Sequence, residues 1–159
     1  MICVFDVGNT NMSAGVWNKQ DLVGHWRIRT DTMRTCDEYA IIVSQLFGLN
    51  GLGCKQIDAV VISSVVPTVM MELECLSTKY FKCKPLIVEA GIRTGLAIKY
   101  DNPREVGADR VVNAVAGYHK YGGPLIIVDF GTATTFCVIN HKGEYREALL
   151  PRALKSLPK

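Results

Sequence analysis

The 159-residue chain lacks the sequence signals of several common protein classes. No apolar run approaches the roughly 20 residues that a membrane-spanning helix needs, so we expect no membrane partner. The glycine-rich phosphate loops G-x-x-x-x-G-K-S/T and G-x-G-x-x-G are absent, which leaves neither common nucleotide-binding signature. Met1–Phe5 leads straight into a strand pattern without a basic segment or cleavage site, so we expect no signal peptide.

Metal-ligand spacing of cysteine and histidine is also missing. The six cysteines include no C-x-x-C pair, and the three histidines are far apart in the sequence. We therefore expect free thiols in a reducing cytoplasm, rather than zinc sites or disulfides.

The formal net charge of +3 is unevenly distributed along the chain. Residues 146–159 carry four basic residues and one acidic residue, so the rest of the chain is balanced. Domains that bind nucleic acid normally present a basic face on the folded body. We therefore expect no nucleic acid among the partners.

One short phrase occurs twice. Residues 2–11 read ICVFDVGNTN, and residues 125–135 read LIIVDFGTATT. In both, an apolar strand pattern ends in Asp, followed by a variable residue, Gly and small polar residues. The carboxylate can hold a cation or its water shell, and the Gly lets backbone N–H groups approach phosphate oxygens. The two copies together predict a two-sided nucleotide clamp. Taken singly, the first copy also fits an ordinary hairpin turn, and the second also fits the start of a strand rich in β-branched residues.

A third candidate site lies at the start of a predicted helix, where YDNP (residues 100–103) is followed by GADR (107–110). Backbone N–H groups at a helix start favour anions. Asp109 can act as a general base toward a substrate hydroxyl, and Arg110 can orient a carboxylate or phosphate. On these residues alone, a surface charge pair in the first helical turn is the simpler explanation.

The order of predicted elements indicates an α/β protein. Three antiparallel strands, followed by alternating helices and strands, form the ribonuclease-H-like pattern, which begins again after Gly123. We expect a complete first domain at residues 1–123 and the opening strands of a second at 124–159. Strands are predicted at 2–7, 12–17, 22–30, 59–63, 85–89, 125–129, 134–140 and 144–145. Helices are predicted from the Thr35–Glu38 capping box to Gly48, from Pro67 to Phe81 and from Val106 to Tyr121.

Four motifs in order, DVGNTN (6–11), YDNP, GADR and DFGTATTF (129–136), resemble the type III pantothenate kinases, formerly called the Bvg accessory factor family. The resemblance covers residues 1–145. It implies the acetate kinase/Hsp70/actin superfamily, with two ribonuclease-H-like domains around a cleft. It also implies ATP-dependent phosphorylation of pantothenate to 4'-phosphopantothenate, the first step of coenzyme A biosynthesis. The enzyme would be a cytoplasmic homodimer that needs Mg²⁺ and a monovalent cation, K⁺ or NH₄⁺.

The same resemblance implies roles for individual residues. Asp109 would be the proton acceptor, and Asp129 would ligate the monovalent cation. ATP would be bound by Asp6, Val7, Gly8, Asn9, Thr10, Asn11, Met12, Ser13 and Thr132. Pantothenate would be bound by Tyr100, Gly107, Ala108, Asp109 and Arg110. Catalysis of such in-line phosphoryl transfer depends mostly on positioning and charge neutralisation.

The sequence departs from the family after Tyr145. The family continues with Gly-Gly and Pro-Gly-Ile segments, whereas this chain reads REALLPRALKSLPK from residue 146. We hypothesise a frameshift just after the Arg146 codon, because restoring one nucleotide there permits a family-like reading; a divergent tail and a deliberately shortened chain are the alternatives. A truncated second domain would leave strand edges and apolar faces uncovered, so we expect a weak or inactive kinase that is prone to association.

Two other functions stay open on the sequence. One is a regulatory, transcriptional-activator-type protein without kinase activity, although no helix-turn-helix pattern is present. The other is a different sugar or acid kinase of the same superfamily, which the YDNP and GADR segments disfavour.

Overall fold

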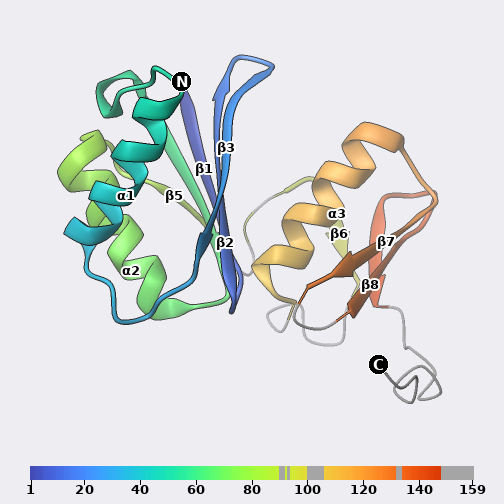
Figure 1. Cartoon of the computed structure of the whole chain (residues 1–159). Helices are drawn as coiled ribbons and strands as arrows, with labels where there is room; N and C mark the ends of the chain where they lie inside the picture. Colours follow the sequence, from blue (N-terminus) through green and yellow to red (C-terminus); the bar gives the residue numbers. More distant parts are fainter. Residues whose placement is uncertain (90–91, 93, 100–105, 132–133, 148–159) are drawn as a thin grey trace. The chain divides into compact units, whose positions relative to one another are not determined.

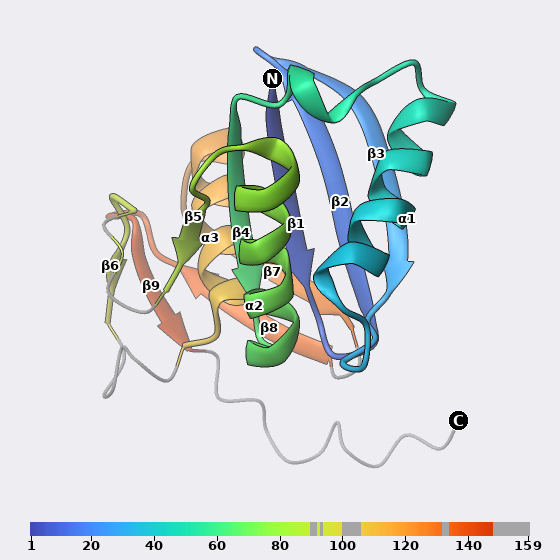
Figure 2. The ribbon, with the colours of Figure 1, turned by 90° about the vertical axis from the view of Figure 1, so that its left-hand side faces the viewer.

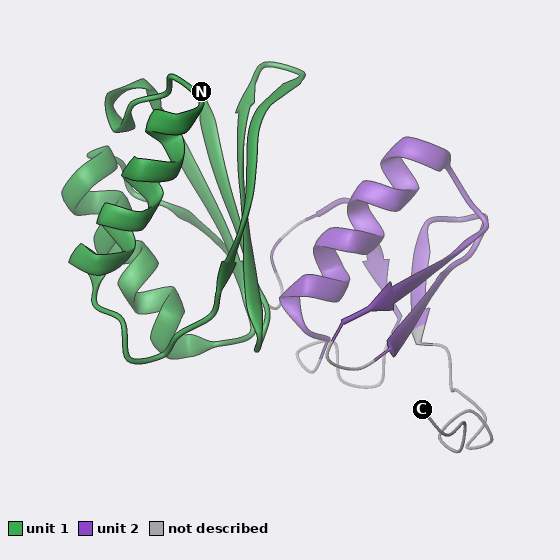
Figure 3. Ribbon diagram, in the orientation of Figure 1, with its two compact units in different colours: residues 1–89 green, residues 90–159 purple. Residues whose placement is uncertain are grey.

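The computed structural model describes residues 1–89, 92, 94–99, 106–131 and 134–147 (Figure 1). By its contacts the chain divides into two compact units, Met1–Glu89 and Ala90–Lys159 (Figure 3). The division comes earlier than the domain boundary that we expected after Gly123. The reason is that α3 (Ala108–Tyr121) packs on strands that follow it in the chain, β7 (Leu125–Phe130) and β8 (Thr134–Ile139).

Unit 1 is built on a five-stranded sheet in the order β3-β2-β1-β4-β5. Its strands are β1 (Ile2–Val7), β2 (Asn11–Asn18), β3 (Asp21–Arg29), β4 (Ala59–Ser64) and β5 (Leu86–Val88). The first three form an antiparallel meander, while β4 runs parallel to β1 and β5 runs parallel to β4. This is the ribonuclease-H-like arrangement predicted from the order of elements.

Two helices, α1 (Cys36–Leu49) and α2 (Pro67–Leu76), cover one face of this sheet (Figure 2). Alternate side chains of a strand point to opposite faces, so Cys3, Phe5 and Val7 of β1 all face the helices, where at most 1% of each is exposed. A short 3₁₀ turn, η1 (Cys54–Gln56), precedes β4. The face with Asp6 is therefore opposite the helical layer.

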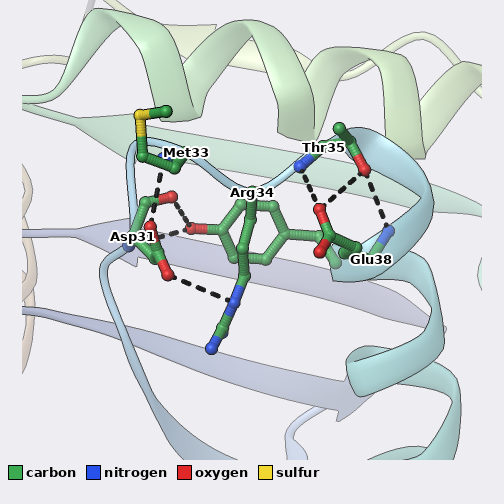
Figure 4. Close-up of polar contacts among 6 residues, drawn as sticks. Asp31, Met33, Arg34, Thr35 and Glu38 are labelled. Atoms are coloured by element: carbon green, nitrogen blue, oxygen red, sulfur yellow. Dashed lines mark hydrogen bonds and ion pairs between the residues drawn. The ribbon is translucent and has the colours of Figure 1, made fainter.

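The start of α1 confirms the predicted capping box. The Glu38 N–H donates to Thr35 Oγ1 at 3.4 Å, and the Thr35 N–H donates to Glu38 Oε2 at 2.8 Å (Figure 4). The Cys36 N–H donates to Glu72 Oε2 of α2 at 2.6 Å. These bonds satisfy three backbone N–H groups at the start of α1, those of Thr35, Cys36 and Glu38. The bond to Glu72 also ties α1 to α2.

The turn before α1 is organised around Asp31 (Figure 4). Its Oδ1 accepts the Met33 N–H at 3.0 Å, and its Oδ2 pairs with Arg34 Nε at 3.5 Å. The buried Tyr39 hydroxyl donates to the Asp31 carbonyl at 2.8 Å. The link from β3 to α1 is thereby held against the helical layer.

The sequence predicts one regular helix from Pro67 to Phe81, but the structure shows that the helical geometry changes within this range. The α-helical part of α2 ends at Leu76, and Ser77–Phe81 form a π-helical turn, η2. The buried Ser77 hydroxyl donates to the Leu73 carbonyl at 2.7 Å, a side-chain bond that competes with the regular backbone pattern. The element ends at Lys82, whose φ of 60° is left-handed.

Unit 2 contains a four-stranded sheet in the order β6-β9-β8-β7, with β6 (Ala97–Ile98) and β9 (Glu144–Glu147). The strands β7, β8 and β9 form an antiparallel meander, and the two-residue β6, too short for the sequence pattern to predict, runs parallel to β9. Helix α3 packs on the Ile127 face. Gly117 permits the close approach, because a Cβ there would lie 2.8 Å from Ile127 Cδ1. Among the described residues, no helix has the length and apolarity required to cross a membrane.

Candidate functional site

The first Asp-x-Gly phrase forms the turn between β1 and β2, and the end of β3 anchors it. The Thr30 hydroxyl donates to the Gly8 carbonyl at 2.7 Å, and the Thr30 N–H donates to the Thr10 carbonyl at 3.0 Å. The Gly8 N–H donates to the Asn11 carbonyl at 3.0 Å, so this N–H serves the turn itself. A Cβ on Gly8 would lie 3.2 Å from that carbonyl oxygen, a tight contact that the glycine avoids.

Strand register places hydroxyl groups on both sides of Asp6. Ser13 of β2 and Ser63 of β4 are its partners in the neighbouring strands, so all three side chains lie on the face opposite α1 and α2. Ser63 is only 3% exposed. Within the described part of the chain, its Oγ is the one buried side-chain N or O atom without a hydrogen-bond partner. Because such an atom costs about 1–3 kcal/mol, it marks a position suited to a ligand oxygen or water.

Two residues of the predicted ATP site point away from this face. The side chains of Val7 and Met12 lie in the core under the helices, where 1% and 0% of each is exposed. Any contact that they make with a nucleotide must therefore come from their backbone groups. The side chains of Asn9 and Thr10 are exposed, and those of Asn11 and Ser13 are half-buried.

In unit 2, the second phrase and the start of α3 meet at one end of the sheet. Asp129 of β7 pairs with Thr135 of β8 and is half-buried. Asp109, Arg110 and Asp129 all act electrostatically on the Cys137 thiol of β8, although burial is the main cause that raises the pKa of this thiol. The three predicted residues therefore lie in unit 2, two of them at the start of α3 and the third on β7, one of the strands on which α3 packs.

Arg110 is not part of a simple surface charge pair. Its side chain is half-buried and interacts with the Tyr145 hydroxyl, which in turn donates to Cys137 Sγ at 3.6 Å. Burial raises the pKa of Tyr145 well above its usual range. The predicted residues Tyr100 and Thr132 lie outside the described residues.

Comparison with known proteins decides the family. The family "Type III pantothenate kinase" matches residues 2–150. This chain belongs to that family. A type III pantothenate kinase from Geobacter sulfurreducens is 61% identical over 145 residues, which are 91% of this chain and 57% of the relative. The chain thus spans just over half the length of this type III pantothenate kinase.

One solved structure supports the fold of this family member. A candidate N-acetylglucosamine kinase from Porphyromonas gingivalis aligns with a TM-score of 0.51 and 14% identity, over 92% of this chain and 47% of that protein. At this identity the likeness shows the ribonuclease-H-like fold alone. YeaZ from Pseudomonas aeruginosa aligns at a TM-score of 0.48 and 10% identity, over 92% of this chain and 63% of that protein.

The donor atoms near the two aspartates can be compared with the Mg²⁺ and monovalent cation that the sequence resemblance leads us to expect. Within the described residues, no group of three or more His, Cys, Asp or Glu is arranged to hold a metal ion. The strand partners of Asp6 and Asp129 instead carry hydroxyl oxygens. Mg²⁺ and K⁺ prefer oxygen ligands, and Mg²⁺ usually keeps several waters beside one or two carboxylates. The residues therefore fit these cations, which the carboxylates of Asp6 and Asp129 would help to hold.

Two residues next to the first phrase carry no sequence signal of their position. The sequence predicts Ser63 only as part of a strand, and its relation to Asp6 depends on the parallel pairing of β4 with β1, which joins distant parts of the chain. The sequence predicts Thr30 only as the end of a strand, and its contact with Gly8 depends on the return of β3 to the first turn. No local pattern around either residue signals these contacts.

Proposed function

We propose that this chain carries the ATP-phosphate and pantothenate subsites for ATP-dependent phosphorylation of pantothenate to 4'-phosphopantothenate, the first step of coenzyme A biosynthesis. The observation that carries the proposal is the family membership of this chain, together with the packing of α3, whose first turn contains Asp109 and Arg110, on the strand that carries Asp129.

In this proposal the Asp6 face binds the phosphates of ATP. Asp6 would hold Mg²⁺, with the hydroxyls of Ser13 and Ser63 beside it. The side chains of Asn9, Thr10 and Asn11 supply short donors to phosphate oxygens. When bound, Mg²⁺ neutralises phosphate charge and orients the transferred group. The Thr30 bonds keep the turn in one conformation, which favours a fixed phosphate position.

The start of α3 binds pantothenate in this proposal. The Asp109 carboxylate accepts the proton of the substrate hydroxyl as the phosphoryl group transfers. Arg110 contacts Tyr145, and its guanidinium has further N–H donors with which to hold the substrate carboxylate. Asp129 ligates the monovalent cation, K⁺ or NH₄⁺. Gly107, Ala108, Tyr100 and Thr132 complete the proposed contacts, by analogy with the family.

The assembly and location belong to the same proposal. We infer a cytoplasmic homodimer as the working form, in keeping with the family. The alternative of a regulatory protein without kinase activity has no support from the family match or from the relative.

Calorimetry with pantothenate and with ATP–Mg²⁺ tests the proposal, together with a sensitive turnover assay. We expect both ligands to bind, and we expect Asp109→Asn to lower turnover at least 100-fold, the usual scale of lost acid–base catalysis, with little change in pantothenate affinity. Asp37→Asn is the matched control, since Asp37 is also the second residue of a 14-residue helix. A chain that binds neither ligand, or an Asp109→Asn variant with undiminished turnover, refutes the proposal.

A further inference from the structure

Two cysteine thiols meet where the start of α1 contacts α2. Cys36 is the first residue of α1, and Cys75 is the last residue but one of α2. A side-chain hydrogen bond joins the two thiol groups. Both are free thiols, and they differ in access, since Cys36 is 6% exposed whereas Cys75 is exposed. An accessible sulfur therefore lies in contact with a buried one.

Polar contacts on either side of the thiols hold these segments together. Glu72 Oε2 of α2 accepts the Cys36 N–H at 2.6 Å. Lys79 Nζ, in the η2 turn, donates to Asp37 Oδ1 at 2.7 Å. Cys75 lies between Glu72 and Lys79, three residues after the first and four before the second, a spacing that places side chains on one helical face. The thiol contact is thus bracketed by two contacts between the same segments.

This arrangement distinguishes the pair from the other cysteines that the structure describes. A second group in unit 1 consists of Cys3, Cys54 and Cys83, in which the last two act on Cys3 through charge. Cys137 lies in unit 2. The thiols that are joined by a hydrogen bond within unit 1 are those of α1 and α2.

We propose that Cys36 and Cys75 are a redox-responsive pair, which a hydroperoxide converts to a reversible disulfide between α1 and α2. Cys75 reacts first, because its thiol is accessible to the oxidant. Cys36 reacts second. Burial, above all, and the hydrogen bond with Cys75 raise the pKa of Cys36 to about 12, so it stays a protonated thiol until its neighbour is oxidised. The inference rests on these contacts of unit 1 and is independent of the proposed activity.

The oxidation by hydrogen peroxide proceeds in two balanced steps. In the first, the Cys75 sulfur attacks one peroxide oxygen, the O–O bond breaks, and Cys75 becomes a sulfenic acid as water leaves. In the second, the Cys36 sulfur attacks the Cys75 sulfur, the S–O bond breaks, and the Cys36 proton leaves with the hydroxyl group as a second water. The two thiols together lose two electrons, which reduce the peroxide to water. A dithiol reductant restores both thiols by exchange.

The disulfide is expected to stabilise unit 1. It closes the chain between residues 36 and 75, which removes conformations from the unfolded ensemble, and the two thiols already touch in the folded chain. The contacts of Glu72 and Lys79 persist, because the new bond joins segments that they already hold together. We therefore expect the oxidised chain to unfold at a higher urea concentration than the reduced chain.

Limited oxidation of the full reduced chain by hydrogen peroxide tests the proposal. We expect mass spectrometry of peptides to find Cys36 joined to Cys75, with the loss of two hydrogen atoms, and dithiothreitol to reverse the change. The urea midpoint is expected to rise on oxidation and to return on reduction. A disulfide that first links other cysteines, or an oxidised chain that unfolds at a lower urea concentration, would overturn the proposal.

Single substitutions separate the two steps. Cys36→Ala removes the second thiol, so we expect a sulfenic acid on Cys75 that dimedone traps, and no rise in the urea midpoint. Cys75→Ser is expected to slow oxidation of Cys36 about tenfold, because the accessible sulfur is gone. Since position 75 is exposed, this variant keeps the test valid even if Cys36→Ala is unstable.

Cys83→Ser is the matched control, because Cys83 is a partly exposed thiol of unit 1 outside the pair. It is expected to form the disulfide between Cys36 and Cys75 at the rate of the wild type. Oxidation of Cys36 that is equally fast in Cys75→Ser and in the wild type contradicts the proposed order of steps. So does a folded Cys36→Ala variant in which dimedone finds no sulfenic acid on Cys75.

Discussion

Ser63 lies beside Asp6 across the parallel pair of β4 and β1, and its buried hydroxyl has no hydrogen-bond partner. We predict that Ser63→Ala leaves the free energy of unfolding unchanged or raises it, because the substitution removes an unsatisfied polar atom. Affinity for ATP–Mg²⁺ is expected to fall about threefold to tenfold, the value of one ordinary hydrogen bond. Urea denaturation and calorimetry measure the two effects.

Ser64→Ala is the control for this prediction. The Ser64 hydroxyl donates to the Val66 carbonyl and accepts the Val66 N–H, both at 3.0 Å. Its loss is expected to destabilise the fold without a specific effect on ATP affinity. If Ser63→Ala is instead the more destabilising variant and ATP binding is unaltered, Ser63 has a structural role only.

Thr30 tests whether the first turn must be held in place. Thr30→Val keeps the shape of the side chain but removes the bond to the Gly8 carbonyl, which is expected to cost about 1 kcal/mol in stability. ATP–Mg²⁺ affinity is expected to fall as well, since the turn becomes less fixed. Thr32→Val, at an exposed position nearby, is expected to change neither quantity. If Thr30→Val and Thr32→Val bind ATP–Mg²⁺ with equal affinity, the hydrogen bond from Thr30 to Gly8 does not contribute to ATP binding.

Local patterns predicted most of unit 1, and the reasons are physical. The Thr35–Glu38 capping box and Pro67 mark helix starts through backbone groups within one turn, so they can be recognised without tertiary information. The end of α2 was missed because it depends on how the buried Ser77 hydroxyl bonds in the folded core. The first Asp-x-Gly phrase can be recognised for the same reason as the capping box, because its Asp, Gly and polar residues are contiguous in the sequence.

The site was predicted only as separate segments. The motif at the start of α3 could be identified, but its residues alone favoured a surface charge pair. The contact of Arg110 with Tyr145, which argues against that explanation, joins α3 to a strand that lies far along the chain. Ser63 was missed for a similar reason, because its partner strand is set by a long crossover. Contacts of high sequence separation therefore limited the prediction.

The capping carboxylate of α1 makes stability depend on pH. The pKa of Glu38 lies below its usual value, chiefly because the carboxylate accepts a hydrogen bond from the Thr35 backbone N–H. A second hydrogen bond, from the Thr35 hydroxyl, lowers the pKa further. The folded chain therefore favours the carboxylate, so its contribution is complete above the unfolded pKa of about 4.3 and is lost as the pH falls through the folded pKa. We predict that the stability difference between the wild type and Glu38→Gln is largest near neutral pH and shrinks toward pH 3.

Urea denaturation at a series of pH values checks this prediction. Thr35→Ala is expected to cost about 1 kcal/mol at neutral pH, the usual value of a helix cap, and to flatten the same pH dependence. Thr68→Ala, an exposed position in the first turn of α2, is the control and is expected to change little. A difference between the wild type and Glu38→Gln that grows as the pH falls would contradict the sign of the shift.

Thiol reactivity provides a test of the unit 1 core. Burial raises the pKa of Cys36 to about 12 and that of the fully buried Cys3 further, so at pH 8 their thiolate forms are scarce. Cys75 is exposed. Brief iodoacetamide treatment, followed by mass spectrometry, is expected to label Cys75 first, and to label Cys3 and Cys36 only after urea is added. Labelling of Cys3 as fast as that of Cys75 in buffer would mean that β1 is not packed beneath the helices.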